Sequence, residues 1–301
     1  MVPELNIKIA VLITTYNGNK WVEQQLLSIL NQSKVSITVF LSDDMSDDGT
    51  FEIVTELAKK FNNIKILPRI KHGTPAKNFH YLIKSCDLSN YDFVSLSDQD
   101  DVWLPEKLYQ AYLKITENSF DAYSSDIIAK YSDNSQKYIK KSFPQRKFDY
   151  LFESAGPGCT YVLKVSVLIA YSKFIKLNEE LVNDINSHDW TLYAYVRSKQ
   201  YNWYIDSQAF MFYRQHSNNA EGVNKGFKAF NNRLMSINNG TYRNKVLSLV
   251  KLYEPENSIF IKLLNGKWTS GLILIKYIRE IRRSPIVQLF MLIILVFRVF
   301  R

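Results

Sequence analysis

The feature that most constrains the fold is a regular alternation of apolar runs with amphipathic stretches over the first 120 residues. One run, IKIAVLI at residues 7–13, is continuously apolar, which is typical of a strand covered on both faces. Strands that alternate with helices form a parallel sheet through right-handed crossovers. We therefore predict an α/β fold with a mostly parallel, Rossmann-like sheet flanked by helices. The expected strands are 7–13, 36–42, 64–67 and 91–97, and the expected helices 20–31, 50–61, 75–85 and 104–116.

Past residue 120 the pattern is less regular. The sequence predicts a strand in FDAYSSDII, a polar excursion over 131–147, and a glycine-rich loop leading into a strand in GPGCTYVLK. Helices are expected near 166–175 and over 188–198, followed by two short strands within 201–216. From residue 226 onward amphipathic helices dominate. We therefore expect a sheet-containing domain at 1–220 and a helical extension at 221–301.

Polar side chains follow three of the predicted strands at the point where each strand ends. They are TTYNG at 14–18, the pair Asp43 and Asp44, and the run Asp98-Gln99-Asp100-Asp101. In parallel α/β sheets, ligands bind outside the carboxyl ends of the strands. The three segments therefore predict one polar site along a single edge of the sheet.

The second acidic run has the chemistry of a metal site. Asp98 and Asp100 alternate along an extended segment, so their carboxylates can point the same way and share a hard cation such as Mg²⁺ or Mn²⁺. The alternative is helix capping, with Asp100 or Asp101 favouring a helix that starts at residues 103–104. Capping explains one carboxylate and leaves the others unexplained. We expect Asp101 to do no more than start this helix.

The first acidic cluster, SDDMSDDGT, also contains both residues that can cap a helix and a carboxylate without such a role. Asp47 or Asp48 can cap the following helix, and Gly49 eases the turn. Asp43 has no such local role, and a carboxylate at a strand end can accept an N–H from the base of a nucleotide. A solvated acidic turn remains the alternative interpretation.

The net charge of +9 belongs to the C-terminal quarter. Residues 221–301 contain 14 Lys and Arg against 4 Asp and Glu, whereas residues 1–220 contain 24 against 25. The tail PIVQLFMLIILVFRVFR is apolar but shorter than the roughly 20 residues that span a bilayer. We predict a helix on an anionic membrane surface, with a buried helix or an oligomer contact as the alternative. Two cysteines and no signal-like N-terminus favour a reducing compartment.

The motifs together resemble a known family. TTYNG, SDDMSDDGT and SDQDDVWLPEKL, in this order, are similar to those of the family-two inverting glycosyltransferases of the GT-A fold. The resemblance is closer to bacterial rhamnosyltransferase-like members, and it covers about the first 220 residues as the catalytic domain. GPGCTYVL, SHDW and YRQHSNN match later motifs of these enzymes.

The resemblance implies roles for individual residues. On the donor side, Thr15 and Tyr16 would line the nucleotide pocket, Asp43 would contact the base, and Asn78 would lie nearby. Asp98 would approach the sugar or ribose, Asp100 would hold the metal, and His216 would lie near the metal or diphosphate. On the acceptor side the implied residues are Gly158, Cys159 and Trp190.

The candidate catalytic base is Asp189. Inverting transfer is a single displacement, so one carboxylate must take the proton of the acceptor hydroxyl. The usual family pattern is Glu-Asp; here it is His188-Asp189, which rhamnosyltransferase-like members often show. We expect His188 to orient or to pack. The alternative for Asp189 is an acid stabilised by the dipole of a helix N-terminus.

The expected function is metal-dependent, inverting transfer of a sugar in cell-surface polysaccharide synthesis. The resemblance favours L-rhamnose from dTDP-rhamnose, delivered to a glycan or lipid-linked glycan at the cytoplasmic face of the membrane. A UDP-hexose donor is the alternative within this fold. A nucleotidyltransferase would need a glycine-rich, basic phosphate loop, and an inactive binding module would lack an intact metal motif or base. No nucleic-acid partner is expected, because the apolar C-terminal pattern fits lipid better.

Overall fold

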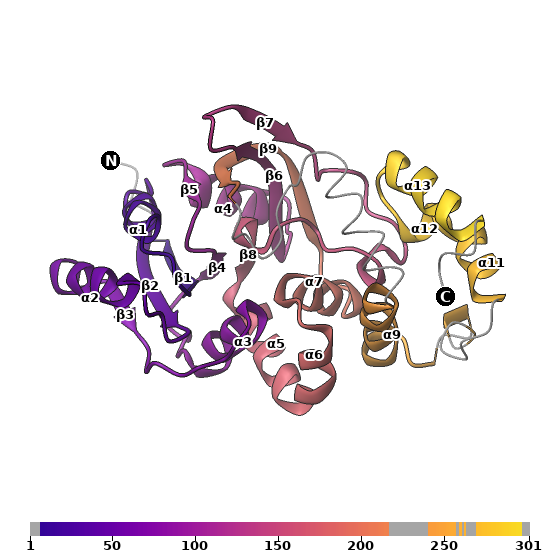
Figure 1. The fold of residues 1–301 in the computed structure, drawn as a ribbon, viewed down its shortest axis with the longest axis horizontal. Helices are drawn as coiled ribbons and strands as arrows, with labels where there is room; N and C mark the ends of the chain where they lie inside the picture. Colours follow the sequence, from indigo (N-terminus) through magenta and orange to yellow (C-terminus); the bar gives the residue numbers. More distant parts are fainter. Residues whose placement is uncertain (1–6, 217–239, 257–258, 261, 263–268, 297–301) are drawn as a thin grey trace.

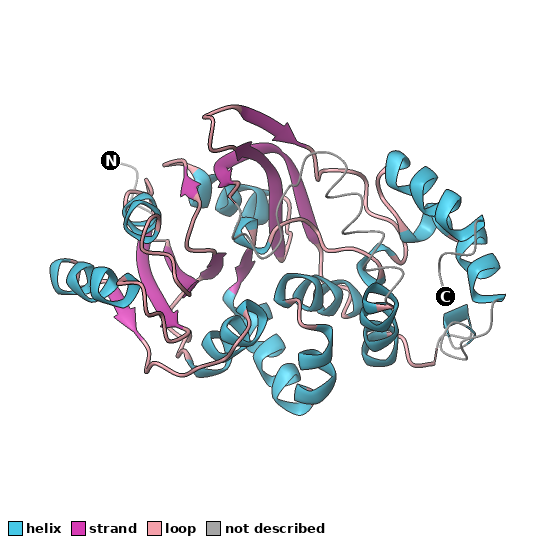
Figure 2. Cartoon of the chain, in the orientation of Figure 1, coloured by secondary structure: helices cyan, strands magenta, loops and turns pink. Residues whose placement is uncertain are grey.

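A computed structural model describes residues 7–216, 240–256, 259–260, 262 and 269–296 (Figure 1). The helices expected between 226 and 239 and the last five residues of the apolar tail lie outside the described residues. Helices cover the sheet, and the last helices of the chain lie at the end of the molecule opposite α1 and α2 (Figures 1 and 2).

The first half of the sheet confirms the predicted parallel arrangement. Its four strands are hydrogen-bonded in the order β3-β2-β1-β4, and each neighbouring pair is parallel. The elements are β1 (Lys8–Thr15), α1 (Val22–Leu30), β2 (Ser36–Asp43), α2 (Thr50–Lys60), β3 (Ile64–Ile66), α3 (Pro75–Ser85) and β4 (Phe93–Ser97).

The continuous apolarity of β1 has a direct cause in the packing. Ile9, Val11 and Ile13 belong to a core that includes residues of α1, α2 and α4 (Lys107–Glu117). Ala10 and Leu12 belong to a second core on the other face, with residues of α3. Because successive strand residues point to opposite faces, burial on both sides leaves no solvent-exposed position between residues 9 and 13.

The second half of the sheet is mixed. Beyond β4 the order continues β8-β6-β9-β5, with β7 paired to β6. The β6–β9 pair is parallel, whereas the β4–β8, β6–β8, β6–β7 and β5–β9 pairs are antiparallel. The strands are β5 (Val102–Trp103), β6 (Ala122–Lys130), β7 (Gln136–Ile139), β8 (Val162–Lys164) and β9 (Trp203–Arg214).

Two predictions for this half were wrong. The segment 131–147 is not wholly a polar excursion, because β7 within it pairs with β6 as an exposed edge strand. The segment 201–216 contains one strand, β9 (Trp203–Arg214), rather than two. The register between β6 and β9 shifts on either side of Asp126, so the irregularity is a bulge and not a break.

The helix expected from residue 104 begins later, at Lys107, with Glu106 as its N-cap residue. Val102 and Trp103 instead pair with Phe212 and Met211 as β5. The prediction that Asp101 starts the helix was therefore wrong.

The remaining helices build on one face of the sheet. They are α5 (Val165–Leu177), α6 (Glu179–Ile185), α7 (His188–Ser198), α9 (Thr241–Tyr253), α11 (Thr269–Lys276), α12 (Ile278–Ile281) and α13 (Pro285–Val296). Leu249 and Ile281 from this C-terminal part share one hydrophobic core with Trp190 and Tyr193 of α7. A division of the chain at residue 220 stays a proposal, because both sides contribute to this core.

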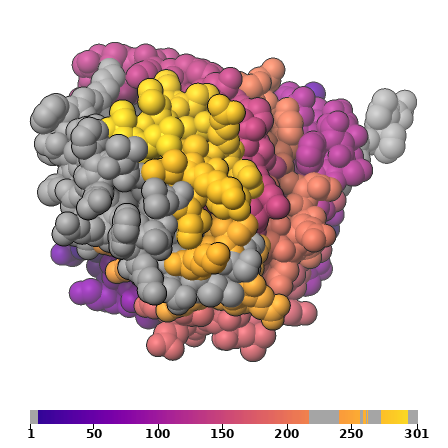
Figure 3. Space-filling view, turned by 90° about the vertical axis from the view of Figure 1, so that its right-hand side faces the viewer, coloured from indigo at the N-terminus to yellow at the C-terminus, as the bar shows by residue number. Residues whose placement is uncertain are grey.

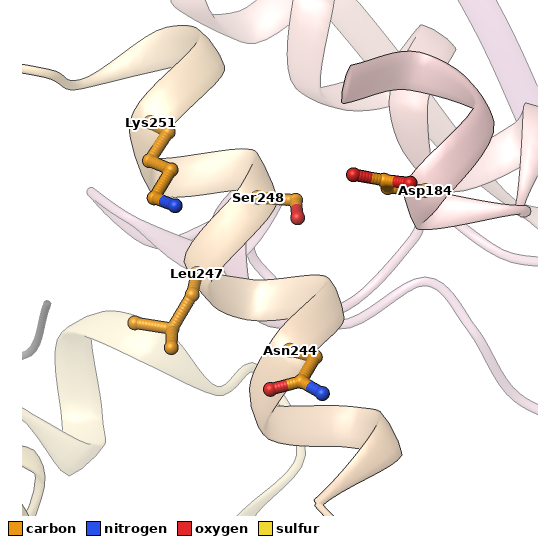
Figure 4. Close-up of a pocket in the computed structure, with 5 residues that line it drawn as sticks. All are labelled: Asp184, Asn244, Leu247, Ser248 and Lys251. Carbon is orange, nitrogen blue, oxygen red and sulfur yellow. The ribbon is translucent and has the colours of Figure 1, made fainter. Parts of the chain in front are cut away.

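Two further observations concern the C-terminal helices. Within the described residues, no helix is both long enough and apolar enough to cross a membrane. An open pocket between α6 and α9 is lined by Asp184, Asn244, Leu247, Ser248 and Lys251 (Figure 4). None of these five residues is a candidate site residue.

His80 of α3 is a buried titratable group in the core. It is 3% exposed, and its Nε2 lies 3.5 Å from the Tyr171 hydroxyl. Burial lowers the pKa of His80 to about 3, and the nearby His188 and Lys84 act in the same direction. In the unfolded chain the pKa of histidine is about 6.5.

We expect His80 to make the protein less stable in mild acid. The unfolded chain binds a proton below about pH 6.5 and the folded chain resists it down to about pH 3, so the free energy of unfolding falls across that range. From pH 7 to pH 5 the contribution is about 2 kcal/mol. Urea unfolding at both pH values should show a smaller loss for His80→Gln than for the wild type. Equal losses would contradict the assignment.

Candidate active site

The ends of β1 and β2 are joined through Asp43. This carboxylate is fully buried, and Thr15 Oγ1 donates to its Oδ2 at 2.9 Å. Ser46 donates through its N–H to Oδ1 at 2.9 Å and through Oγ to Oδ2 at 2.5 Å, and Arg69 Nε donates to Oδ1 at 3.0 Å. Both oxygens are therefore engaged within the chain. Asp43 organises this corner of the site, and its contact with a base stays a prediction.

Gln99 was given no role from the sequence, yet it connects two of the predicted segments. Its Oε1 accepts from the N–H of Tyr16, and its Nε2 donates to the Tyr16 carbonyl, both at 2.8 Å. A Cβ on Gly18 would lie 2.3 Å from Gln99 Oε1, so a larger residue at this position would displace the amide. The Tyr16 side chain is 57% exposed and available to a ligand. The signal in the sequence was the position of Gln99 between two acids.

Asn78 lies at the edge of the same region. It is buried in α3, and its Nδ2 donates to the Ser42 carbonyl at 3.2 Å. Within the described part of the chain its Oδ1 has no hydrogen-bond partner. Asp44 accepts from the N–H groups of His72 and Gly73 and so fixes the loop before α3. A role for Asn78 at the nucleotide remains a prediction.

The structure brings Asp100 and His216 together, although 116 residues separate them. His216 Nε2 lies 2.7 Å from Asp100 Oδ2. The His216 ring is stacked on Trp21, with centroids 3.9 Å apart and an interplanar angle of 12°. Arg214 Nε donates to the Asp100 carbonyl at 2.8 Å. The β5–β9 pairing places these residues, because it brings the end of β9 alongside the acidic turn.

Behind this pair lies a buried cluster that the sequence did not predict. Ligand atoms of Asp98, Asp101 and Cys159 lie within 4.8 Å of one another. Burial raises the pKa of Asp101 well above its usual value, and the charges of Asp100 and Asp98 add to this effect. Burial likewise raises the pKa of the Cys159 thiol. Burial lowers the pKa of Lys107 to about 7, and its Nζ lies 3.6 Å from the centroid of the Trp103 ring.

The donor types in this region fit a hard divalent cation. Asp98 and Asp100 offer carboxylate oxygens, and His216 offers an imidazole nitrogen at 2.7 Å from Asp100. The Cys159 sulfur suits such a cation poorly, because it is soft and burial keeps the thiol protonated. Asp100 and His216 therefore stay the predicted metal ligands, with Asp98 two residues before Asp100 in the sequence.

Asp189 lies in the first turn of α7. Ser187 Oγ and the Trp190 N–H both donate to its Oδ1, each at 2.7 Å. Among the described residues none donates a hydrogen bond to Oδ2. One oxygen of the carboxylate is thus held in place while the other remains available to accept a proton.

Gly158 brings the acceptor-side loop against this carboxylate. A Cβ on Gly158 would lie 2.7 Å from His188 Nε2 and 3.2 Å from Asp189 Cβ, so a larger residue would push the loop away. The His188 ring is stacked on Phe79 with centroids 3.9 Å apart, and burial lowers its pKa. A neutral, packed imidazole fits the expectation that His188 orients its surroundings.

Residues 158 and 159 contact both parts of the site, the region of Asp189 and the acidic cluster. Gly158 packs against Asp189, and Cys159 lies next to Asp98 and Asp101. Cys159 is fully buried, and Trp190 is 8% exposed with its Nε1 donating to the Tyr150 carbonyl at 2.9 Å. Their acceptor-side roles remain predictions.

Comparison with known proteins agrees with this arrangement. Residues 10–236 match the family model of Glycosyl transferase family 2. The dTDP-rhamnosyl transferase RfbG of Shigella flexneri is 40% identical over 290 residues, which are 96% of this chain and 100% of that protein. The match favours a glycosyltransferase over the nucleotidyltransferase alternative.

Solved structures of low sequence identity show the same fold. TarS 1-349 of Staphylococcus aureus, in complex with UDP-GlcNAc, has a TM-score of 0.54 at 18% identity, covering 92% of this chain and 82% of that chain. The mannosyltransferase PcManGT from Pyrobaculum calidifontis, in complex with GDP-Man and Mn²⁺, has a TM-score of 0.52 at 15% identity, covering 95% and 79%. With its GT-A fold and these matches, the chain belongs to glycosyl transferase family 2 and is a glycosyltransferase.

Proposed function

We propose that this enzyme transfers L-rhamnose from dTDP-rhamnose, with inversion, to a glycan or lipid-linked glycan acceptor in cell-surface polysaccharide synthesis. The observation that carries the proposal is the Asp189 carboxylate, held through Oδ1 beside Gly158, whose neighbour Cys159 lies in the acidic cluster. The near full-length similarity to a dTDP-rhamnosyl transferase supports the choice of donor.

The arrangement supports a single displacement. Asp189 Oδ2 takes the proton of the acceptor hydroxyl as that oxygen attacks the anomeric carbon, and the nucleoside diphosphate leaves with the electron pair of the broken bond. The hydrogen bonds from Ser187 and Trp190 to Oδ1 hold the carboxylate in one orientation. Holding base and acceptor in place lowers the barrier because little orientation remains to be gained during the reaction.

The donor nucleotide would lie along the carboxyl edge of β1, β2 and β4. Thr15, Tyr16, Asp43, Asn78 and Asp98 are the proposed nucleotide-sugar residues. The hydrogen bonds of Gln99 to Tyr16 keep the first and fourth strand ends at a constant separation. This rigidity would present the donor to the acceptor in one geometry.

A divalent cation, Mg²⁺ or Mn²⁺, would be held by Asp100 and His216 with Asp98 beside them. When bound, such an ion neutralises charge on a departing diphosphate. The protein's own contribution is to hold the ligands ready: Trp21 stacks on His216, and Arg214 donates to the Asp100 carbonyl.

A screen of nucleotide sugars with purified enzyme and a glycan acceptor tests the proposed function. We expect turnover with dTDP-rhamnose to exceed that with UDP-glucose, and Asp189→Asn to reduce transfer by at least about 100-fold, because the acceptor then loses its base. Donor binding by this variant, measured by calorimetry, should stay near the wild-type value. Preferential use of a UDP-hexose would overturn the donor assignment, and wild-type turnover by Asp189→Asn would remove its role as base.

The metal assignment makes a separate prediction. Asp100→Ala should weaken Mn²⁺-dependent binding of dTDP by at least about tenfold, because a cation ligand and a partner of His216 are lost together. EDTA should inhibit the wild-type enzyme, and added Mn²⁺ or Mg²⁺ should restore it. Full activity in EDTA would refute the metal site.

We propose that the enzyme works in the cytoplasm, peripherally bound to the inner face of the membrane through α13. Ile286, Leu289 and Ile293 are 81%, 61% and 49% exposed and share one helix face. Met291 of the same helix is buried, so α13 is anchored on one side and presents apolar side chains on the other. Helices near the end of the chain occupy an open face of the molecule (Figure 3). The basic charge of 221–301 would add attraction to anionic lipids.

Liposome flotation tests this surface. The triple variant Ile286→Ser, Leu289→Ser and Ile293→Ser should bind anionic vesicles at least about tenfold more weakly, because three apolar side chains no longer enter the lipid. The control is Leu177→Ser, which removes an exposed apolar side chain, 85% exposed, from α5. Equal binding by the wild type and the triple variant would contradict the proposal.

A further inference from the structure

Arg283 is a buried cation from the turn between α12 and α13. Its side chain is nearly enclosed, with 4% of the residue exposed. Its Nε lies 3.4 Å from Asp149 Oδ2 and 3.3 Å from Glu153 Oε1. The backbone N–H of Arg283 also donates to Glu153 Oε1 at 2.7 Å. A buried charge persists only when it is paired, so this contact fixes how the C-terminal segment meets the segment at 149–154.

The carboxylates of Asp149 and Glu153 differ in how many partners they have besides Arg283. Asp149 has other partners, because Arg197 Nη1 donates to its Oδ1 and the Tyr193 hydroxyl to its Oδ2, both at 3.0 Å. The cations beside Glu153 in the described residues are Arg283 and Arg282, the latter at 3.7 Å. The position of Glu153 is therefore set from the C-terminal part of the chain.

A chain of hydrogen bonds leads from Arg283 to the acceptor side of the site. Arg283 Nη2 donates to the Ser154 carbonyl. Ser154 Oγ in turn donates to the Gly156 carbonyl at 3.1 Å. Two residues further on, Gly158 packs against Asp189. The loop 154–158 therefore lies between the buried cation and the proposed base.

The loop also has polar contacts with other segments: Ser124 Oγ donates to the Ala155 carbonyl at 3.5 Å, and the Thr160 N–H donates to the Pro157 carbonyl at 3.0 Å. The Tyr161 hydroxyl donates to the Gly156 carbonyl at 3.1 Å and accepts from the Ala155 N–H at 3.2 Å. Gly156 has φ of +139°, a conformation that glycine tolerates and other residues resist. Such a backbone needs external contacts to keep one conformation, and Arg283 supplies one at its start.

We propose that Arg283 is a positioning residue for sugar transfer: it holds the loop 154–158 against Asp189, so that the C-terminal segment completes the acceptor half of the site. The inference deepens the proposed function, since it takes this loop as the acceptor wall. It also gives the helices after residue 240 a part in the reaction besides any contact with a membrane.

Arg283→Met tests the proposal, with Arg279→Met as its matched control on an exposed position of α12. We expect Arg283→Met to lower kcat/KM for the acceptor by at least about tenfold while hydrolysis of the donor by water stays within about twofold, because water needs no acceptor wall. The control should match the wild type in both rates. A parallel fall of transfer and donor hydrolysis in Arg283→Met would overturn the positioning role.

A second variant and a second measurement guard against a protein that folds poorly. Ser154→Ala removes the hydrogen bond to Gly156 and leaves the buried ion pairs intact, so it should lower acceptor kcat/KM by about 2- to 10-fold. Amide hydrogen exchange over 153–158 should be faster in both Arg283→Met and Ser154→Ala, and unchanged over β1 and β4. Unchanged exchange in the loop would refute the link between Arg283 and the loop. This measurement needs no turnover, so it is independent of the proposed function. The proposed function would be overturned if the wild type cleaved no nucleotide sugar.

Discussion

The short antiparallel pairing of Val102 and Trp103 with Phe212 and Met211 holds the candidate site together. It turns the chain back directly after β4, so the acids Asp98 to Asp101 form a fixed turn and not a solvated loop. It also brings Arg214 and His216 to that turn, where they contact Asp100. Neighbouring carboxylates repel one another, and this pairing keeps Asp98, Asp100 and Asp101 together in spite of that repulsion.

The opposite half of the site depends on close packing around Gly158. The absence of a side chain lets the loop approach Asp189 and His188, and the next residue, Cys159, reaches the acidic cluster. Asp189 and the acids at 98–101, about ninety residues apart in sequence, thus both lie next to this pair of neighbouring positions. Arg283 and the helices of the C-terminal core support this loop from behind.

The sequence predicted well wherever the signal was local. Continuous apolarity marked β1, and apolar residues at helical spacing marked α1 and α2, because burial of one helix face leaves a periodic pattern. Prediction failed where a partner far along the chain decides the structure. β5 is two residues long and exists only because it pairs with β9. β9 continues past the point where its alternation is interrupted, because its extra residues form a bulge opposite Asp126 of β6. The buried state of Asp101 follows from the same distant contacts.

By itself, the sequence determined which chemical groups stand at the ends of strands and at the start of α7, and in what order: Asp43, then Asp98 and Asp100, then Asp189 and His216. Only the tertiary structure decided which of them meet. It placed His216 against Asp100 and Tyr16 against Gln99. It also buried Asp101 beside Cys159 and placed Arg283 against the loop 154–158. The physical reason is that hydrogen bonds and ion pairs act over a few ångströms in space, and residue types along the chain carry no record of which distant segments will be neighbours.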